Sequence, residues 1–123
     1  MRVRLFVMPL AAGLVLATAA WAHAFLDHAA PAVGATVPAP RQVSIWFSEQ
    51  VEPAFSVIEV TDAAGHRVDA ADTHIDPADA KLLHVSLKPV PPGRYEVRWR
   101  VVSVDTHHTK GDFGFTVAAK PAP

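Results

Sequence analysis

The chain has 123 residues, of which 50% are hydrophobic and 19% are charged, so its length suits one domain with a core and excludes a long disordered chain. The formal net charge is −1 and the basic residues form no stripe, which argues against nucleic acid as a partner. Cysteine is absent, which excludes zinc fingers, iron–sulfur clusters, disulfide scaffolds and thiol nucleophiles, so nitrogen and oxygen must bind any metal.

Residues 1–22 have the pattern of an export signal. Two arginines near the start precede an apolar run over residues 5–17, which is too short to span a bilayer, and small residues precede the predicted cleavage site. An uncleaved membrane anchor is the alternative. Cleavage between Ala22 and His23 would place the protein outside the cytoplasm with histidine as its first residue. No later segment could cross a membrane, so no membrane insertion is expected after cleavage.

The first half of the mature chain predicts strands joined by turns. Alternation over 43–47 predicts a strand that ends at Ser48-Glu49 and buries one face. A second strand over 55–60 has apolar residues on both parities, which predicts burial of both faces, and a turn at 62–65 follows it. The polar segment 68–80 predicts at most a helical turn.

The second half shows clearer alternation. One strand buries Leu83 and Val85, and the last one buries alternate residues over 113–117. Between them, one parity is apolar and the other charged, so the predicted core-facing residues are Tyr95, Val97, Trp99 and Val101. Five or more short strands predict an all-β fold, a Greek-key sandwich or barrel of the immunoglobulin or cupredoxin kind. It forms a single domain over residues 23–119, followed by a short tail at 120–123.

A histidine at a free amino terminus is an unusual metal ligand. The α-amine and ring Nδ1 of His23 can close a six-membered chelate on one ion, which no internal histidine can do. In the Asp105-Thr106-His107 segment, an extended backbone would place Asp105 and His107 on one face, about 6.5–7 Å apart along the strand. Three nitrogens and one oxygen suit Cu(II), whereas zinc prefers a tetrahedral site. The alternative for Asp105 is a cap on an ordinary turn.

The strand parity predicts an irregularity at this position. The parity that buries Val101 would also bury Ser103, Asp105 and His107. Either the strand bulges near Val101-Val102, or polar groups lie at the edge of the core. The other histidines match no ligand pattern and are predicted to be solvated rather than a second metal site; they are His28, His66, His74, His84 and His108.

Three segments, in chain order, are similar to the CopC family of periplasmic copper-binding proteins. They are His23-Ala24-Phe25-Leu26 with Pro31 and Gly34-Ala35-Thr36, then Val43 to Phe47 running into Ser48-Glu49-Gln50-Val51, and Val101 to His107 with Gly111 and Phe115. The resemblance covers nearly the whole mature chain, and its most specific element is the terminal histidine paired with Asp-x-His.

The resemblance implies a Greek-key β-barrel that binds one Cu(II) ion through the amine and ring of His23, with Asp105 and His107. It also implies that Glu49 orients a ligand near the copper. The function implied is a periplasmic copper buffer or carrier for homeostasis or resistance, a monomer and not an enzyme, with an inner-membrane copper permease as partner. The mature chain has no methionine, so a second, Cu(I) site of the kind found in some family members is not expected.

Two other functions remain open from the sequence. A copper-dependent oxidative enzyme is one, because lytic polysaccharide monooxygenases also bind copper through an amino-terminal histidine. The resemblance is limited to that first ligand, and an anionic oxygen donor such as Asp105 would disfavour reduction of Cu(II). The other is a structural β-sandwich that binds no metal.

Overall fold

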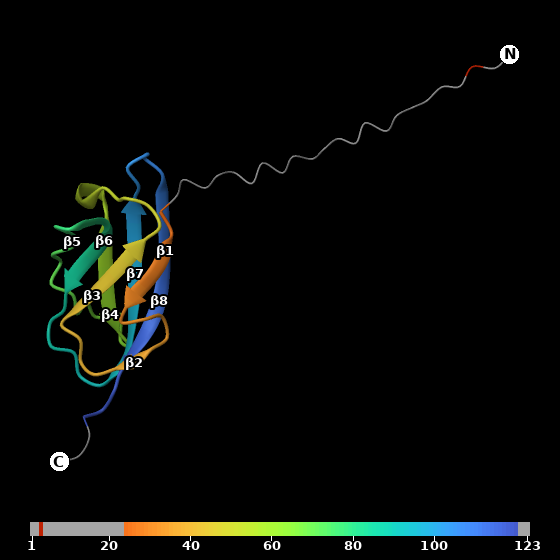
Figure 1. Cartoon of the computed structure of the whole chain (residues 1–123). Coiled ribbons are helices and arrows are strands. Elements are labelled where there is room, and N and C mark those ends of the chain that lie inside the picture. The colour runs from red at the N-terminus through yellow and green to blue at the C-terminus, as the bar shows by residue number, and fades with distance from the viewer. Residues whose placement is uncertain (1–2, 4–23, 121–123) are drawn as a thin grey trace.

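The computed structural model describes Val3 and residues 24–120 and consists almost entirely of strands (Figure 1). His23, the predicted cleavage site, nearly all of the predicted signal peptide and the last three residues lie outside the described residues. The described strands are β1 (Leu26–Ala30), β2 (Thr36–Val37), β3 (Gln42–Phe47), β4 (Val57–Asp62), β5 (His74–Asp76), β6 (Asp79–Ser86), β7 (Gly93–Val102) and β8 (His108–Val117). One 3-10 turn, η1, covers Pro53–Phe55.

The strands form two four-stranded sheets that pack face to face. Sheet I has the order β1-β3-β6-β5, and sheet II has the order β2-β8-β7-β4. Neighbouring strands are antiparallel except for β2 and β8, which are parallel. The chain crosses between the sheets at β1–β2, β2–β3, β3–β4, β4–β5 and β6–β7, and these crossovers between antiparallel strands give Greek-key connectivity. The predicted all-β Greek-key sandwich is therefore confirmed.

The core lies between the two sheets and contains the alternate residues that the sequence patterns indicated. Burial removes this apolar surface from water, which is the main favourable contribution to folding. In β7 the ring of Tyr95 stacks on Phe115 with 5.4 Å between centroids, and Trp99 meets Phe47 edge to face at 5.2 Å. The largest fully buried side chains include Ile45, Ile58, Leu83, Val85, Val97, Val101 and Phe115.

The prediction of a strand buried on both faces over 55–60 is wrong. Phe55 belongs to η1 and is 72% exposed. Proline at the first position of η1 has φ set for a helical turn, and the hydroxyl of Ser56 donates to the carbonyl of Glu52 at 2.7 Å, which closes that turn. Strand β4 therefore begins only at Val57, and its core face is the one that carries Ile58 and Val60.

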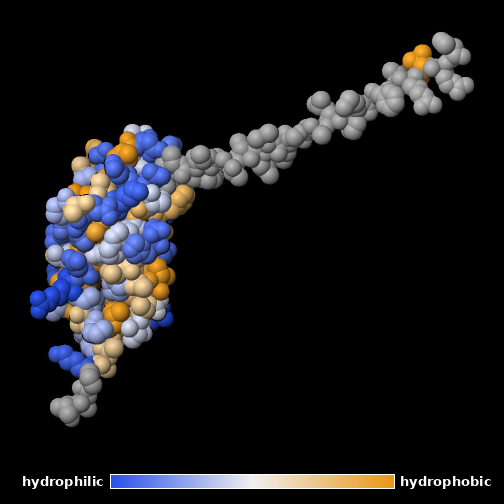
Figure 2. Space-filling view, in the orientation of Figure 1, coloured by the Kyte–Doolittle hydropathy of each residue, from blue (hydrophilic) through white to orange (hydrophobic). Residues whose placement is uncertain are grey.

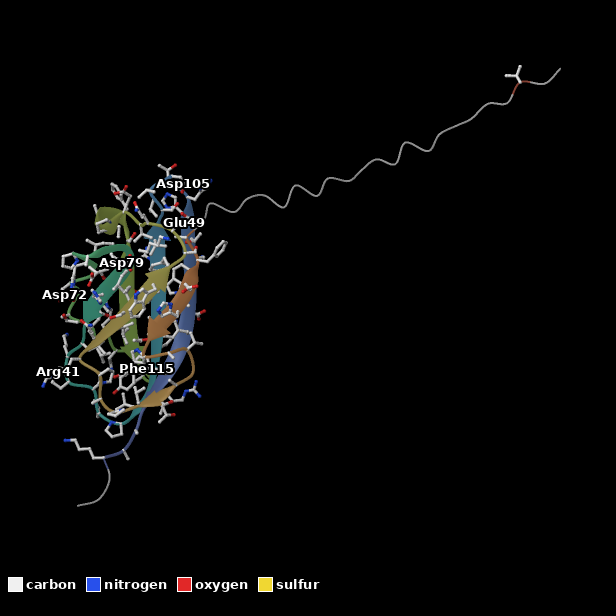
Figure 3. The ribbon with its side chains drawn as sticks, viewed as in Figure 1. Arg41, Glu49, Asp72, Asp79, Asp105 and Phe115 are labelled. Atoms are coloured by element: carbon white, nitrogen blue, oxygen red, sulfur yellow. The ribbon has the colours of Figure 1, made fainter. Side chains whose placement is uncertain are left out.

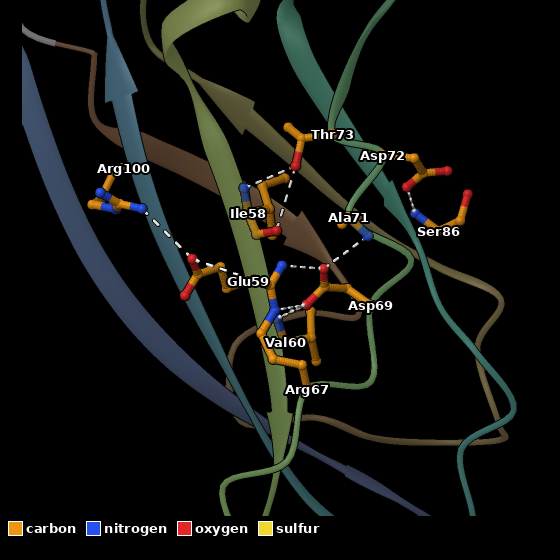
Figure 4. A network of polar contacts seen from close by, with 10 residues as sticks. All are labelled: Ile58, Glu59, Val60, Arg67, Asp69, Ala71, Asp72, Thr73, Ser86 and Arg100. Carbon is orange, nitrogen blue, oxygen red and sulfur yellow. Dashed lines mark hydrogen bonds and ion pairs between the residues drawn. The ribbon is translucent and has the colours of Figure 1, made fainter.

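A buried carboxylate organises the polar segment that joins β4 to β5 (Figure 4). The side chain of Asp69 is 0% exposed and accepts hydrogen bonds from the backbone N–H groups of Val60 at 2.8 Å and Ala71 at 3.0 Å. Arg67 Nη2 donates to it at 2.6 Å. A buried charge is tolerated only when it is paired and hydrogen-bonded, as here. The segment expected to hold at most a helical turn instead contains this network and strand β5.

The outer surface mixes hydrophilic and hydrophobic side chains, and no single hydrophobic patch covers the face seen in Figure 2. Within residues 24–120, the large hydrophobic side chains that are exposed are Phe25, Val33, Phe55 and Val104. The described part of the chain contains no helix with the length and hydropathy needed to span a membrane.

Candidate metal centre

The predicted ligands Asp105 and His107 lie in the loop that connects β7 to β8. The β7–β8 pairing continues without a bulge to its last pair, Val102 with His108, so the predicted bulge near Val101-Val102 does not occur. Ser103 follows, 1% exposed and bridged to Val51, so a polar residue does lie at the edge of the core. Of the two alternatives that strand parity left open, the second one holds for Ser103 alone, because Asp105 and His107 are exposed.

The loop between β7 and β8 is a tight turn and not the extended segment expected from the sequence. Thr106 N–H donates to the carbonyl of Ser103 at 2.8 Å, and Ser103 N–H donates to the carbonyl of His107 at 3.0 Å. Thr106 has φ of 72°, a left-handed conformation that is unfavourable for a β-branched residue. This reversal brings His107 Nδ1 to 3.2 Å from Asp105 Oδ2.

The turn holds Asp105 as an anion with access to solvent. The hydroxyl of Ser103 donates to Asp105 Oδ1, and together with the ring of His107 it holds the pKa of Asp105 below its usual range. The side chains of Asp105 and His107 are 38% and 51% exposed. A deprotonated carboxylate therefore lies beside the His107 ring at the surface, and a carboxylate must be deprotonated to bind a metal ion.

The described segment that begins at Ala24 is held in place beside this turn. Ala24 is 0% exposed, and its carbonyl accepts a hydrogen bond of 2.6 Å from the hydroxyl of Thr109 in β8. Phe25 N–H donates to Ser48 Oγ at 2.9 Å, and Ser48 N–H donates to the carbonyl of Phe25 at 2.8 Å. The segment after His23 is thus anchored to β8 on one side and to the end of β3 on the other.

Glu49 lies at the same end of the sandwich as Asp105, as Figure 3 shows. It is exposed and directly follows Ser48. The next two residues run alongside the turn, because Val104 N–H donates to the carbonyl of Gln50 at 3.1 Å and Val51 pairs with Ser103. Three predicted site residues, Glu49, Asp105 and His107, therefore gather at one end. His23 lies outside the described residues.

Some residues of this region were not predicted from the sequence. Parity placed Ser103 in the core but gave no indication that its hydroxyl holds Asp105. No pattern indicated that Thr109 anchors Ala24. His108 opens β8 and lines a groove beside the turn, with Phe55, Val104 and Thr106. Within residues 24–120, no group of three or more His, Asp and Glu side chains is arranged to hold a metal ion as it stands.

Comparison with known proteins identifies the family. The model of the CopC domain matches residues 26–118. Protein YobA of Escherichia coli K12 is 41% identical over 99 residues, which are 79% of this chain and 80% of that protein. Copper resistance protein C of Xanthomonas campestris pv. juglandis is 36% identical over 117 residues, 90% of this chain and 91% of that protein.

A solved structure agrees with these matches in both fold and sequence. The crystal structure of CopC from Methylosinus trichosporium OB3b has a TM-score of 0.76 and 31% identity, and the match covers 82% of this chain and 99% of that chain. The chain belongs to the CopC family.

Proposed function

We propose that the exported protein binds one Cu(II) ion at this end of the sandwich and serves as a periplasmic copper buffer or carrier. The ligands are the α-amine and ring of His23, the carboxylate of Asp105 and the ring of His107. One observation carries the proposal: Ala24 is held to β8 at Thr109, two residues beyond His107. Because adjacent Cα atoms are about 3.8 Å apart, cleavage before His23 would leave the new amine one peptide unit from this anchor.

The chemistry of the donor set favours divalent copper. Two imidazoles and an amine with one anionic oxygen suit the tetragonal preference of Cu(II), which also has the highest affinity among the common divalent ions. The low pKa of Asp105 keeps that ligand deprotonated. Relatives named copper resistance protein C support a role in copper resistance or homeostasis. Binding and release are the whole of the proposed chemistry, with no turnover.

Glu49 is proposed to orient a ligand rather than to bind the metal. It is exposed at the end of β3, directly after the Ser48 that is hydrogen-bonded to Phe25. A carboxylate that accepts a hydrogen bond from a ligating group fixes the direction of that group.

Transfer of the ion to a partner is part of the proposal. Asp105 and His107 are partly exposed, and the apolar side chains of Phe55 and Val104 flank the adjacent groove. A partner such as an inner-membrane copper permease could therefore contact this end of a monomeric protein without unfolding it.

Titration of the exported protein, residues 23–123, with Cu(II) tests the assignment. Competition against a chelator measures the affinity, and the d–d absorption band reports the ligand field. Asp105→Asn and His107→Gln are expected to lower the affinity at least about tenfold, because each removes a ligand. His108→Gln, which changes a histidine next to His107 in sequence but outside the proposed ligand set, is the matched control, and its affinity should stay within about twofold of wild type. Wild-type affinity in both ligand variants would refute the assignment.

A further inference from the structure

A pair of facing histidines lies on the β5 edge of sheet I. His74 in β5 and His84 in β6 are direct partners in the antiparallel pairing, and their ring centroids are 5.5 Å apart. Asp72 and Asp79 mark this edge in Figure 3, whereas Asp105 and Glu49 lie at another end of the molecule. Among the described strands, β5 is the last one of sheet I, and His74 on it is exposed.

His84 is not the solvated residue that the sequence predicted. Its side chain is only 13% exposed, and both ring nitrogens are engaged. Nδ1 lies 2.7 Å from Ser44 Oγ on β3, and Nε2 lies 2.9 Å from Asp76 Oδ1 on β5. A register shift between Ile75 and Asp76 accompanies this arrangement. Such irregularities often redirect side chains near functional sites.

A hydrolytic role for the Ser44, His84 and Asp76 chain is excluded by access. Ser44 is 3% exposed and lies under the hydrogen bond to His84, so no substrate carbonyl could approach its hydroxyl. A merely structural role accounts for His84 but leaves unexplained why a second imidazole, His74, stands directly opposite it. The two rings together point to metal binding.

We propose that His74 and His84 form a two-imidazole site for a divalent transition-metal ion, Zn(II) or Cu(II), with Asp76 as a third, anionic donor. Directly opposed residues of an antiparallel pair have Cβ atoms about 4.5–5.5 Å apart. With metal–nitrogen bonds of about 2.0–2.1 Å, two imidazoles on one ion have centroids about 5–6 Å apart. The observed 5.5 Å is in that range.

Hydrogen bonds to Nδ1 of His74 and of His84 favour the tautomers in which Nε2 can bind a metal ion. His74 Nδ1 lies 2.7 Å from the carbonyl oxygen of Asp72, which can only accept, so Nδ1 carries the proton and Nε2 keeps a lone pair. In His84 the proton can move to Nδ1, because the hydroxyl of Ser44 is able to accept as well as donate. Partners on Nδ1 that orient the ring are typical of histidines that bind metal through Nε2.

Binding completes a site that is only partly assembled without the ion. No three His, Asp or Glu side chains within residues 24–120 already surround a common point. The ion would take the place of the proton between His84 Nε2 and Asp76 Oδ1, now 2.9 Å apart, and a small tilt of the exposed His74 ring about its Nδ1 hydrogen bond to Asp72 would bring His74 Nε2 to the ion.

Zinc titration of the exported protein preloaded with one equivalent of Cu(II) tests the proposal. Calorimetry gives the stoichiometry and affinity, and the ring-proton NMR signals of the histidines identify the ligands. The expected result is one Zn(II) per chain with shifts of the His74 and His84 signals, and at least about tenfold weaker binding in His74→Gln and His84→Gln. His66→Gln is the control, because His66 is an 80% exposed histidine in a hairpin turn.

Each outcome is decisive. Unchanged zinc affinity in His74→Gln, or an equal loss in His66→Gln, would overturn the site. His74→Gln leaves the Ser44, His84 and Asp76 hydrogen bonds intact, so it decides the question even when His84→Gln fails to fold. Asp105→Asn should retain zinc binding at the β5 edge, which separates failure of this site from failure of the proposed copper site.

Discussion

Ser103 is the buried side chain on which the turn of the candidate metal centre depends. Its hydroxyl donates to Asp105 Oδ1 and accepts from His107 N–H at 3.3 Å. One 1% exposed hydroxyl thus holds both predicted metal-binding residues of the turn. Loss of a hydrogen-bond partner of a metal ligand typically weakens metal binding about 10–100-fold.

Ser103→Ala is expected to weaken Cu(II) binding about tenfold and to lower the free energy of unfolding by about 1–3 kcal/mol. The reason is that Asp105 loses its donor and His107 N–H is left without this acceptor. Chelator competition and urea denaturation measure the two effects. Ser56→Ala is the control, since Ser56 is also buried and its hydroxyl donates to Glu52 and accepts from Val102 but bonds neither Asp105 nor His107. The Ser56→Ala variant should be less stable but should keep wild-type copper affinity. Wild-type copper affinity in Ser103→Ala would contradict the role of Ser103.

At the scale of the element, the β7–β8 hairpin depends on a glycine that faces a tryptophan. Gly111 is the register partner of Trp99, whose ring is almost buried and contacts Phe47. A Cβ atom at Gly111 would lie 2.5 Å from Trp99 Cζ2, which is closer than two carbons can approach. The indole therefore covers the strand backbone at Gly111, and aromatic cover of a strand glycine compensates for its missing side chain.

Gly111→Ala should therefore destabilise the protein by about 1–3 kcal/mol, because the Trp99 ring must move within a packed core. Thermal or urea denaturation measures the loss. Gly114→Ala on the same strand provides the comparison, since its nearest contact would be the Tyr95 carbonyl oxygen at 3.4 Å and the change should be within about 1 kcal/mol. Equal effects of the two substitutions would be inconsistent with this explanation.

At the scale of the whole molecule, Asp69 connects the two sheets. Its carboxylate accepts from Val60 N–H in β4 of sheet II, and its backbone pairs with Leu87, just beyond β6 of sheet I. Burial tends to raise the pKa of Asp69, but the Arg67 guanidinium and the two backbone N–H groups outweigh burial, so the net effect is a lowered pKa.

A lowered folded-state pKa makes the contribution of Asp69 depend on pH in a defined direction. It is present at neutral pH and is lost as the pH falls through the folded-state pKa, below about 3.9. Asp69→Asn is expected to lower the free energy of unfolding by about 2–3 kcal/mol at pH 7, with the difference from wild type shrinking under acid conditions. Urea denaturation at several pH values checks this. A difference that stays constant from pH 7 to pH 2 would show that the charge of Asp69 is not responsible.

Alternation allowed much of the fold to be predicted, because a period of two places residues on one face wherever a strand is regular. Strands β3, β7 and β8 bury the expected side chains. The hydrophobic pattern alone wrongly predicted that Phe55 lies in a strand, because Pro53 begins a 3-10 turn that includes Phe55.

The candidate site was predicted only as a set of residue types. Asp105 and His107 indicated metal binding because carboxylates and imidazoles are common metal ligands. The close approach of these two side chains depends on Thr106, whose left-handed conformation is rare for a β-branched residue. The burial of His84 depends on Ser44, 40 residues earlier in the chain, and on strand pairing that no local pattern specifies.

The most direct test of the account compares two forms of the protein, one that begins at His23 and one with a single alanine ahead of it. Electron paramagnetic resonance and chelator competition measure the ligands and the Cu(II) affinity of each. A chelate at His23 predicts one tightly bound Cu(II) in the form that begins at His23, and a Cu(II) affinity lower by about 100-fold or more in the extended form, because the amine and ring no longer chelate together. Equal affinity and identical spectra in the two forms would contradict it.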